Sequence, residues 1–321
     1  MSLALSTRGL KAMDARKVLL VPVDFGEPSR AAALRALSLA DPDTDAIQVL
    51  HVRVFPGISL DPRLSGELLV EIRRKERRAL QEFSEQVNAR GVGLTTRVRD
   101  GDPVREIHSV AREESIRLLV VGSHGRTGME RLVLGSTAER VVQGAPVPVL
   151  VVRSSRERAR LPIRSVLMAT DFSTDAQSVE SLVANWARRF SAEVEVIHVI
   201  RDTAVLFAPY AVEGSEDFEG EMMASATARM KRVLSRLAEL GVKAKSKIVY
   251  GQAEEEILVR AEATNVGVIA LGTRGYSGIQ RFLLGSVTQR VLARARCDVL
   301  VSSERVSDGV GFAVGKNEIG R

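Results

Sequence analysis

Short apolar runs alternate along the chain with longer stretches in which apolar residues recur every three or four positions. A run of four to eight apolar residues is typical of a buried parallel strand, and the longer period is typical of a helix with one buried face. In the first half of the chain, the pattern predicts strands over residues 17–24, 47–54, 94–99, 118–121 and 147–153. It predicts helices over residues 27–40, 67–90, 103–114 and 136–143. The predicted order is therefore βαβαβαβαβ.

The second half of the chain repeats this pattern. A Gly-x-x-Gly stretch, nine residues and Gly-Ser occur twice, and each landmark moves by 150 positions (272 − 122 = 275 − 125 = 285 − 135 = 150). The aspartate that ends the first strand moves by 147 positions (171 − 24 = 147), so a small length difference falls between the second and third strands. We therefore predict two tandem domains, 1–155 and 156–305, followed by a flexible tail over 306–321.

Strands that alternate with helices form parallel sheets with helices on both faces and right-handed crossovers. We therefore predict the α/β class, with two doubly wound domains whose five strands each follow the order 3-2-1-4-5. In such a sheet, ligands bind at the carboxyl ends of the two strands that flank the reversal of winding. Those ends carry Asp24 and the Gly122 loop in the first half, and Asp171 and the Gly272 loop in the second. The sequence thus predicts one crevice per domain.

Composition limits the classes of protein that fit. The 321 residues are 45% hydrophobic and 27% charged, which is typical of globular domains. No apolar run approaches the ~18 residues of a membrane span and residues 1–20 lack a secretory apolar core, so we expect a cytoplasmic protein without membrane contact. The net charge of +6 suits an anionic partner, but the basic cluster at 73–78 is interleaved with glutamate and aromatic residues make up only 4%. We therefore expect an anionic small molecule and no nucleic acid.

The residue types in each crevice suit a nucleotide. Glycines let the backbone approach a ligand closely, and Gly135-Ser136 and Gly285-Ser286 precede helices whose free backbone N–H groups attract phosphate. A carboxylate repels phosphate, so we expect Asp24 and Asp171 to accept hydrogen bonds from ribose hydroxyls or a base amine. A ligand with both kinds of group is a nucleotide.

Simpler interpretations stay open beside this one. The glycines could be turn residues only, and Asp24 and Asp171 could cap the helices that follow them. The four histidines have no Cys, His or carboxylate nearby at the spacing of a metal site, so we expect no metal centre. Cys297, the only cysteine, stands where Val147 stands in the first half and is expected to be a small apolar side chain.

Signatures of catalysis are missing from the sequence. It contains no G-x-x-x-x-G-K-[ST] phosphate loop, no G-x-S-x-G nucleophile elbow and no H-E-x-x-H zinc motif. Phosphoryl transfer needs a placed base and metal-binding carboxylates, whereas the glycine loops offer only Glu130, whose counterpart is Gln280. We therefore expect no efficient catalysis. The alternatives are a slow ATPase or nucleotidyl-transfer enzyme, and a scaffold with vestigial nucleotide sites.

The duplicated glycine motif resembles the ATP-binding signature of the universal stress protein family. The segments Pro22-Val23-Asp24-Phe25, Ala169-Thr170-Asp171-Phe172, His51-Val52 and His198-Val199 are also similar to that family. The resemblance covers residues 17–303. It implies a tandem member that binds ATP, with or without Mg²⁺, and regulates a stress response without efficient catalysis.

The resemblance also implies which residues contact the nucleotide. The first site comprises Pro22, Asp24, Val52, Val121, Gly122, Gly125, Gly135, Ser136 and Thr137, of which the last four meet the phosphates. The second site comprises Asp171, Val199, Leu271, Gly272, Gly275, Gly285, Ser286, Val287 and Thr288.

The two sites differ at three matched positions. Ala138 stands where Thr288 stands, which predicts one hydroxyl donor fewer at the first site. Ala169 replaces Pro22, and Tyr276 replaces Arg126. We therefore expect unequal affinities.

The last strand of each half lies at a sheet edge in the predicted order, and both 147–153 and 297–303 contain Val-Leu-Val. An open apolar edge pairs readily with another strand. The roughly ten residues 154–163 between the halves span at most ~35 Å, which is enough for the second edge to dock on the first. We predict a pseudo-dimer within the chain and, because members of the family commonly dimerise through this strand, a further homodimer.

Overall fold

The computed structural model describes residues 16–54, 66–87, 91–113, 115–123, 134–153, 155–201, 215–273 and 284–302. The first repeat contains β1 (Lys17–Val23), α2 (Glu27–Leu39), β2 (Asp45–Arg53), α3 (Gly66–Val87), β3 (Gly93–Asp100), α4 (Pro103–Ala111), β4 (Ile116–Gly122), α5 (Ser136–Val142) and β5 (Val149–Val152). A short helix, α6 (Arg156–Ala159), leads to the second repeat. That repeat contains β6 (Ser165–Ala169), α7 (Thr174–Phe190), β7 (Glu193–Arg201), α9 (Ser215–Glu239), β8 (Ala244–Gly251), α10 (Ala253–Ala263), β9 (Val268–Gly272), α11 (Ser286–Arg294) and β10 (Asp298–Ser302). The α/β class and the predicted element order are confirmed.

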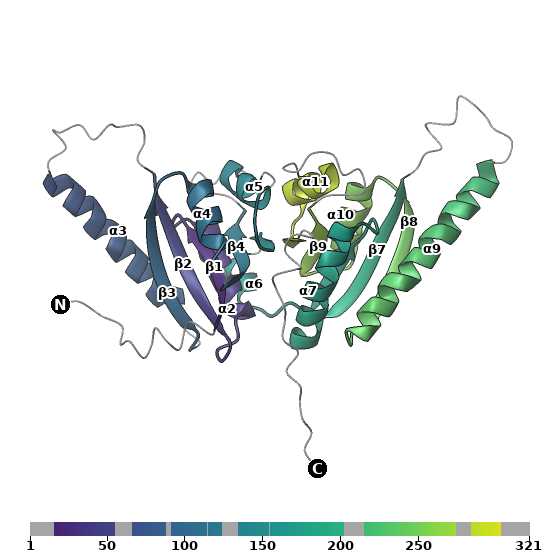
Figure 1. Cartoon of the computed structure of the whole chain (residues 1–321), viewed down its shortest axis with the longest axis horizontal. Coiled ribbons are helices and arrows are strands. Elements are labelled where there is room, and N and C mark those ends of the chain that lie inside the picture. Colours follow the sequence, from purple (N-terminus) through teal and green to yellow (C-terminus); the bar gives the residue numbers. More distant parts are fainter. Residues whose placement is uncertain are drawn as a thin grey trace, which may run out of the picture.

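All ten of these strands belong to one sheet, in the order β3-β2-β1-β4-β5-β10-β9-β6-β7-β8. Within each repeat the strands pair in parallel, and the predicted order 3-2-1-4-5 is confirmed. Figure 1 shows the two repeats side by side, with α3 and α9 at the outer ends. In the strand order, β5 and β10 are the two central strands. The carboxyl ends of β1 and β4 therefore flank the reversal of winding, as do those of β6 and β9 in the second repeat.

The two repeats meet where β5 and β10 pair in an antiparallel manner. Leu150 lies opposite Leu300, and Val149 and Val151 lie opposite Val301 and Val299. Because Leu300 is the repeat counterpart of Leu150 (300 − 150 = 150), this pair marks a pseudo-twofold axis through the sheet. The predicted pairing of the two edges within the chain is confirmed. Association with a second chain stays a prediction.

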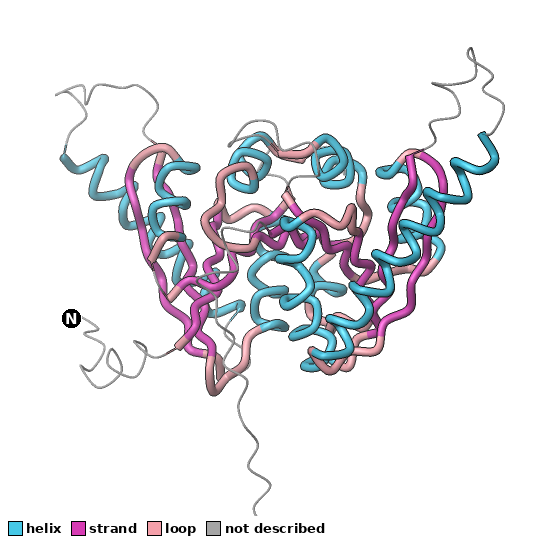
Figure 2. Tube along the Cα trace, turned by 45° about the vertical axis from the view of Figure 1, so that its right-hand side comes forward, coloured by secondary structure: helices cyan, strands magenta, loops and turns pink. Residues whose placement is uncertain are grey.

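Each face of the sheet carries one hydrophobic core that runs across both repeats. Helices α2, α3, α7 and α9 cover one face, where Phe83 and Leu237 are fully buried. Helices α4, α5, α10 and α11 cover the other face. Alternate residues of β1 point to the two faces, so Leu19 enters the first core and Leu20 the second, which explains why the strand reads as a continuous apolar run. Figure 2 shows the helices on both sides of the strands.

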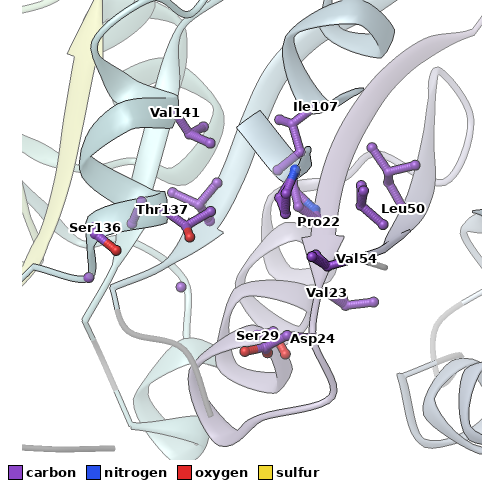
Figure 3. A pocket seen from close by; sticks show the side chains of 16 residues that line it. Pro22, Val23, Asp24, Ser29, Leu50, Val54, Ile107, Ser136, Thr137 and Val141 are labelled. Carbon is purple, nitrogen blue, oxygen red and sulfur yellow. The ribbon is translucent and has the colours of Figure 1, made fainter. Parts of the chain in front are cut away.

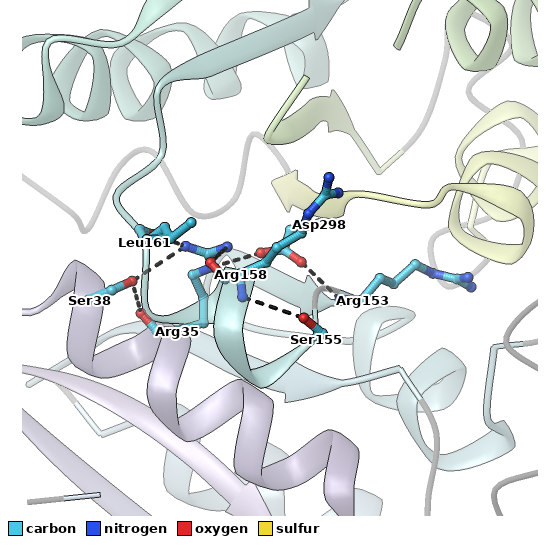
Figure 4. A network of polar contacts seen from close by, with 7 residues as sticks. All are labelled: Arg35, Ser38, Arg153, Ser155, Arg158, Leu161 and Asp298. Atoms are coloured by element: carbon cyan, nitrogen blue, oxygen red, sulfur yellow. Dashed lines mark hydrogen bonds and ion pairs between the residues drawn. The ribbon is translucent and has the colours of Figure 1, made fainter. Parts of the chain in front are cut away.

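A buried ion pair joins the repeats beside the β5–β10 junction (Figure 4). Arg35 of α2 donates from Nε to Asp298 of β10 over 2.7 Å, and their side chains are 5% and 0% exposed. The same guanidinium donates to the backbone carbonyl oxygens of Leu161 (2.6 Å) and Arg158 (3.2 Å) in the connecting segment. The other oxygen of Asp298 accepts the backbone N–H of Arg153 at 2.9 Å. Both charged groups are therefore hydrogen-bonded inside the protein, as a buried pair requires.

A second ionic contact between the repeats surrounds Asp45, which is 2% exposed at the start of β2. Its carboxylate accepts hydrogen bonds from Arg117 of β4 at 2.6 Å and from Arg189 of α7 at 3.3 Å. Arg189 also lies 3.7 Å from the carboxylate of Asp41. Charged groups from both repeats thus meet at two places, Arg35 with Asp298 and Arg189 with Asp45.

The structure differs from the sequence-based expectation at the ends of elements. The connecting segment contains helix α6, which the sequence pattern did not predict. Helix α4 ends at Ala111 before the predicted position 114, and β5 is shorter at both ends than residues 147–153. The predicted tail 306–321 lies outside the described residues, and the boundary at residue 155 stays a prediction. Among the helices that the structure describes, none is both long and apolar enough to cross a bilayer.

The buried ion pair predicts the outcome of one substitution. Arg35→Leu, which introduces the residue found at the equivalent position 182, removes the guanidinium partner of the fully buried Asp298 carboxylate. We expect a loss of about 3–5 kcal/mol in the free energy of unfolding, measured by urea denaturation. The double variant R35L/D298N removes the charge as well and should regain much of that loss.

Arg74→Leu is the control, because Arg74 and Glu71 form an exposed pair that contributes at most about 1 kcal/mol. An Arg35→Leu protein as stable as the Arg74→Leu protein would contradict the role given to the buried pair.

Candidate functional site

A cavity of about 360 Å³ opens at the carboxyl ends of β1, β2 and β4 in the first repeat. Its lining combines a carboxylate, hydroxyl groups and an apolar wall (Figure 3). The residues that line it are Pro22, Val23, Asp24, Ser29, Leu50, Val52, Val54, Pro103, Ile107, Val121, Gly122, Gly135, Ser136, Thr137, Ala138 and Val141. In Figure 3, Asp24 and Ser29 lie on the β1–α2 side, and Ser136 and Thr137 lie at the start of α5. The cavity therefore has two separate polar ends.

The second repeat holds an equivalent cavity of about 420 Å³. The residues that line it are Ala169, Thr170, Asp171, Ala176, Ile197, Val199, Arg201, Ala253, Ile257, Leu271, Gly272, Gly285, Ser286, Val287 and Thr288. Every predicted site residue that the structure describes lines one of these two cavities. Gly125 and Gly275 lie outside the described residues. The sequence motif and the topology thus converge on the same two places, while the roles of the individual residues stay predictions.

A tight turn positions the aspartate of each site. In the first repeat, the backbone N–H of Gly26 donates to Asp24 Oδ1 over 3.0 Å, and Phe25 between them has a φ of 67°. This left-handed backbone is rare for a bulky residue and persists where the surroundings hold it in place. The ring of Phe25 lies 4.6 Å from the ring of His51, which donates from Nδ1 to the carbonyl oxygen of Val23 at 2.9 Å.

The second repeat builds the same turn with different side chains. Asp171 Oδ1 accepts the backbone N–H of Ser173 at 3.0 Å and its hydroxyl at 2.5 Å, around Phe172 with a φ of 64°. His198 donates to the carbonyl oxygen of Thr170 at 2.8 Å, and burial lowers the pKa of His198, which favours the neutral ring. The histidines within β2 and β7 therefore hold the two turns through hydrogen bonds to the backbone at the ends of β1 and β6.

The aspartates do not cap the following helices, so that alternative interpretation is wrong. Gly26 is the N-cap of α2, without a side-chain hydrogen bond. Ser173 caps α7 by accepting the backbone N–H of Ala176. Each aspartate instead fixes the turn between strand and helix while it lines the cavity.

Gly122 serves the packing of a helix on a strand. A Cβ atom added at this position would lie 2.6 Å from the backbone carbonyl of Pro28 and 2.8 Å from its Cβ atom. The missing side chain therefore lets the start of α2 approach the end of β4. We expected this glycine to make room for a ligand, and the structure shows that α2 fills that room.

Helices α5 and α11 both begin after a glycine. Gly135 and Gly285 are the two N-cap residues, and as glycines they contribute no side-chain hydrogen bond to the first turn of α5 or α11. The first residues of both helices line the cavities, and the backbone N–H groups of a first helical turn are a geometry that attracts anions. The hydroxyls of Ser136 and Thr137 add donors in the first repeat, as Ser286 does in the second.

The hydroxyl of Thr288 has another task. It donates to the carbonyl oxygen of Gly272 over 2.8 Å, and the residue is only 4% exposed. The expectation that Ala138 costs the first site a ligand donor is therefore wrong, because the matching hydroxyl of the second site is engaged with the backbone.

Sequence reasoning missed several lining residues. Leu50 and Ile107 form part of the apolar wall, but the pattern marked them only as core positions of a strand and a helix. Val54 lines the first cavity and is 59% exposed, whereas its counterpart in the second is Arg201 (201 − 54 = 147). Aligning the two repeats would have revealed this difference in charge.

Neither a metal centre nor a reactive thiol is part of this arrangement. In the ranges that the structure describes, no three His, Cys, Asp or Glu side chains gather in a way that could hold a metal ion. Burial raises the pKa of the Cys297 thiol to about 12, so it stays protonated at neutral pH. The described residues that line the two cavities therefore offer carboxylate and hydroxyl groups and, in the second cavity, the guanidinium of Arg201.

Comparison with known proteins places the whole arrangement in one family. The model of the universal stress protein family matches the chain twice, over residues 15–153 and 162–303. A universal stress protein of Mycolicibacterium smegmatis is 26% identical over 292 residues, which cover 89% of this chain and 97% of that protein.

A second relative and a solved structure agree with this match. A universal stress protein of Methanocaldococcus jannaschii is 34% identical over 143 residues, which cover 44% of this chain and 84% of that protein. The crystal structure of a universal stress protein from Archaeoglobus fulgidus has the same fold, with a TM-score of 0.69 at 22% identity over 89% of this chain and 98% of that one. The chain therefore belongs to the universal stress protein family, as a member with two tandem repeats.

Proposed function

We propose that the chain binds ATP in each of its two cavities and acts as a nucleotide-dependent regulatory protein of the stress response, without efficient catalysis. The observation that carries the proposal is that the same arrangement of lining residues occurs in both repeats. Each cavity is lined by a carboxylate at the end of the first strand and by the start of a helix whose N-cap is a glycine. Membership of the universal stress protein family supports the same function.

The parts of each cavity match the parts of a nucleotide. The apolar wall with Leu50, Val52 and Ile107 suits the flat faces of adenine, and Asp24 suits the ribose hydroxyls or the base amine. The first turn of α5 suits the phosphates. Volumes of about 360 and 420 Å³ lie in the usual range of small-molecule pockets, about 300–1,000 Å³. Any Mg²⁺ that accompanies ATP would be held mainly by the phosphates.

The described linings favour binding over catalysis. Each contains one carboxylate, whose oxygen already holds a turn, and neither contains a histidine or a lysine. Phosphoryl transfer needs a base beside the attacking group and carboxylates for the metal. Glu130 and Gln280, the loop positions considered for such a role, lie outside the described residues.

The position of α5 and α11 suits regulation. Each helix begins at a cavity, and the two meet across the pseudo-twofold axis, where Gln289 donates to Glu139 over 2.7 Å. A phosphate at the start of either helix therefore acts on an element of the junction between the repeats.

Nucleotide binding predicts two adenosine-dependent sites per chain. Asp24→Asn and Asp171→Asn keep an oxygen for the turn but remove the charge, so each variant should weaken its own site by roughly tenfold, about 1.4 kcal/mol. Titration calorimetry with ATP would measure this, with Arg74→Ala as the exposed control. Absence of heat, or equal binding of inorganic triphosphate, would contradict the proposal.

The difference at Val54 and Arg201 predicts unequal sites. A guanidinium over an aromatic base adds about 0.5–2 kcal/mol, so Arg201→Val should weaken the second site and Val54→Arg should strengthen the first. The two substitutions form a reciprocal swap of repeat counterparts, and calorimetry on both reports the change at each site. Affinities that stay unchanged in both variants would exclude Arg201 from nucleotide recognition.

Regulation without efficient catalysis predicts slow turnover. With saturating ATP and Mg²⁺, we expect phosphate release below about 1 per second, the low end of typical enzymes. Sustained release above that rate, lost in the double variant D24N/D171N, would identify the protein as an enzyme.

A further inference from the structure

The strand pairing at the junction does not by itself choose a partner. β5 and β10 present Val-Leu-Val to each other, with Leu150 opposite its own counterpart Leu300. A β5 strand from a second copy of the chain would offer the same three side chains in the same register. The hydrogen bonds of the edge and the apolar contacts therefore fit a first repeat as well as a second one.

The charged residues that form the hydrogen-bonded ionic contacts beside the strands have uncharged counterparts in the other repeat. Arg35 has Leu182 as its counterpart in the other repeat (182 − 35 = 147), and Asp298 has Pro148 (298 − 148 = 150). The same holds around Asp45, whose counterpart is Ala192 (192 − 45 = 147). The counterparts of Arg117 and Arg189 are Gly267 (267 − 117 = 150) and Pro42 (189 − 42 = 147). None of these charges is duplicated.

Pairing between like repeats would separate the charges of the main ion pair. Two first repeats would each bury Arg35 against Pro148 of the other chain, and two second repeats would each bury Asp298 against Leu182. Both side chains are at most 5% exposed in the observed junction. A buried charge without its partner strongly disfavours an assembly.

The contact between α5 and α11 on the axis also disfavours the pairing of two first repeats. Gln289 is the counterpart of Glu139 (289 − 139 = 150), and the two side chains are hydrogen-bonded at 2.7 Å. Two first repeats would instead bring one Glu139 carboxylate against another. Like charges at that distance repel.

We propose that these charges make the junction surface selective, so that the first repeat accepts the second repeat of this chain and rejects another first repeat. The partner it fits is a surface that carries a buried carboxylate at position 298 and a neutral amide at position 289. The apolar strands stabilise the junction, and the charges that occur in only one repeat determine which partner binds.

A disulfide trap in the full chain tests this proposal. With Cys297→Ser as background, Leu150→Cys places a thiol opposite Leu300 in the observed junction, where no disulfide can form. Pairing of two first repeats places two such thiols opposite each other on the axis, about 4.5–5.5 Å apart between Cα atoms, which permits a disulfide. The chain is unfolded, refolded at several protein concentrations, oxidised and examined on non-reducing gels.

The proposal expects few linked dimers when the native charges are present. Adding R35L, E139Q and D298N should raise the linked fraction by roughly tenfold, because like repeats then pair without a buried charge. Phe83→Leu, a core change in α3 away from the junction, is the matched control for general destabilisation.

Two results would overturn the proposal that the charges make the junction selective. One is equal linking with native and neutralised charges, and the other is an increase of the same size in the Phe83→Leu protein. E139Q alone changes an exposed contact and should also increase linking, so the test holds even if the triple variant fails to fold. No increase in E139Q together with an unfolded triple variant would count against the proposal.

Discussion

The antiparallel pairing of β5 with β10 is the constraint on which the rest of the structure depends. It joins two five-stranded sheets into one, and both hydrophobic cores therefore continue from one repeat into the next. It also covers two apolar edges that would otherwise expose unpaired backbone groups. Through this junction α5 and α11 come into contact, so the two cavities lie at fixed positions relative to each other.

The sequence predicted the parts of the fold that follow from local periodicity. Apolar runs and amphipathic stretches indicated the strands and helices, and the winding rule then located the crevices at Asp24 and Asp171. The ion pair of Arg35 with Asp298 was not predictable in this way, since its partners are 263 positions apart and no local pattern links them. Helix α6 was missed for a related reason. The carbonyl oxygens of Arg158 in this helix and of Leu161 just after it accept hydrogen bonds from Arg35, which is more than 120 positions away in the sequence.

Single residues of the site also combine a part that the sequence predicts with a part that only tertiary contacts determine. The spacing of Gly122 predicted that a side chain there is not tolerated, but only the structure shows that Pro28 is the neighbour that requires it. Thr288 looked like a ligand donor until its hydrogen bond to Gly272 was visible. Spacing identifies positions that cannot change freely, whereas the neighbour that imposes the restriction depends on tertiary contacts that spacing does not contain.

Fusion of the two repeats changes what a single substitution can do. In an assembly of two identical chains, each interface residue occurs twice, so any change appears on both sides of the axis and the surface must complement itself. In the fused chain, each position is encoded separately, and opposite charges such as Arg35 and Asp298 can occupy places that symmetry would force to be alike. The same freedom extends to the two cavities, where Val54 and Arg201 occupy matched positions. One gene can thus evolve two different pockets within a shared, pseudo-symmetric frame.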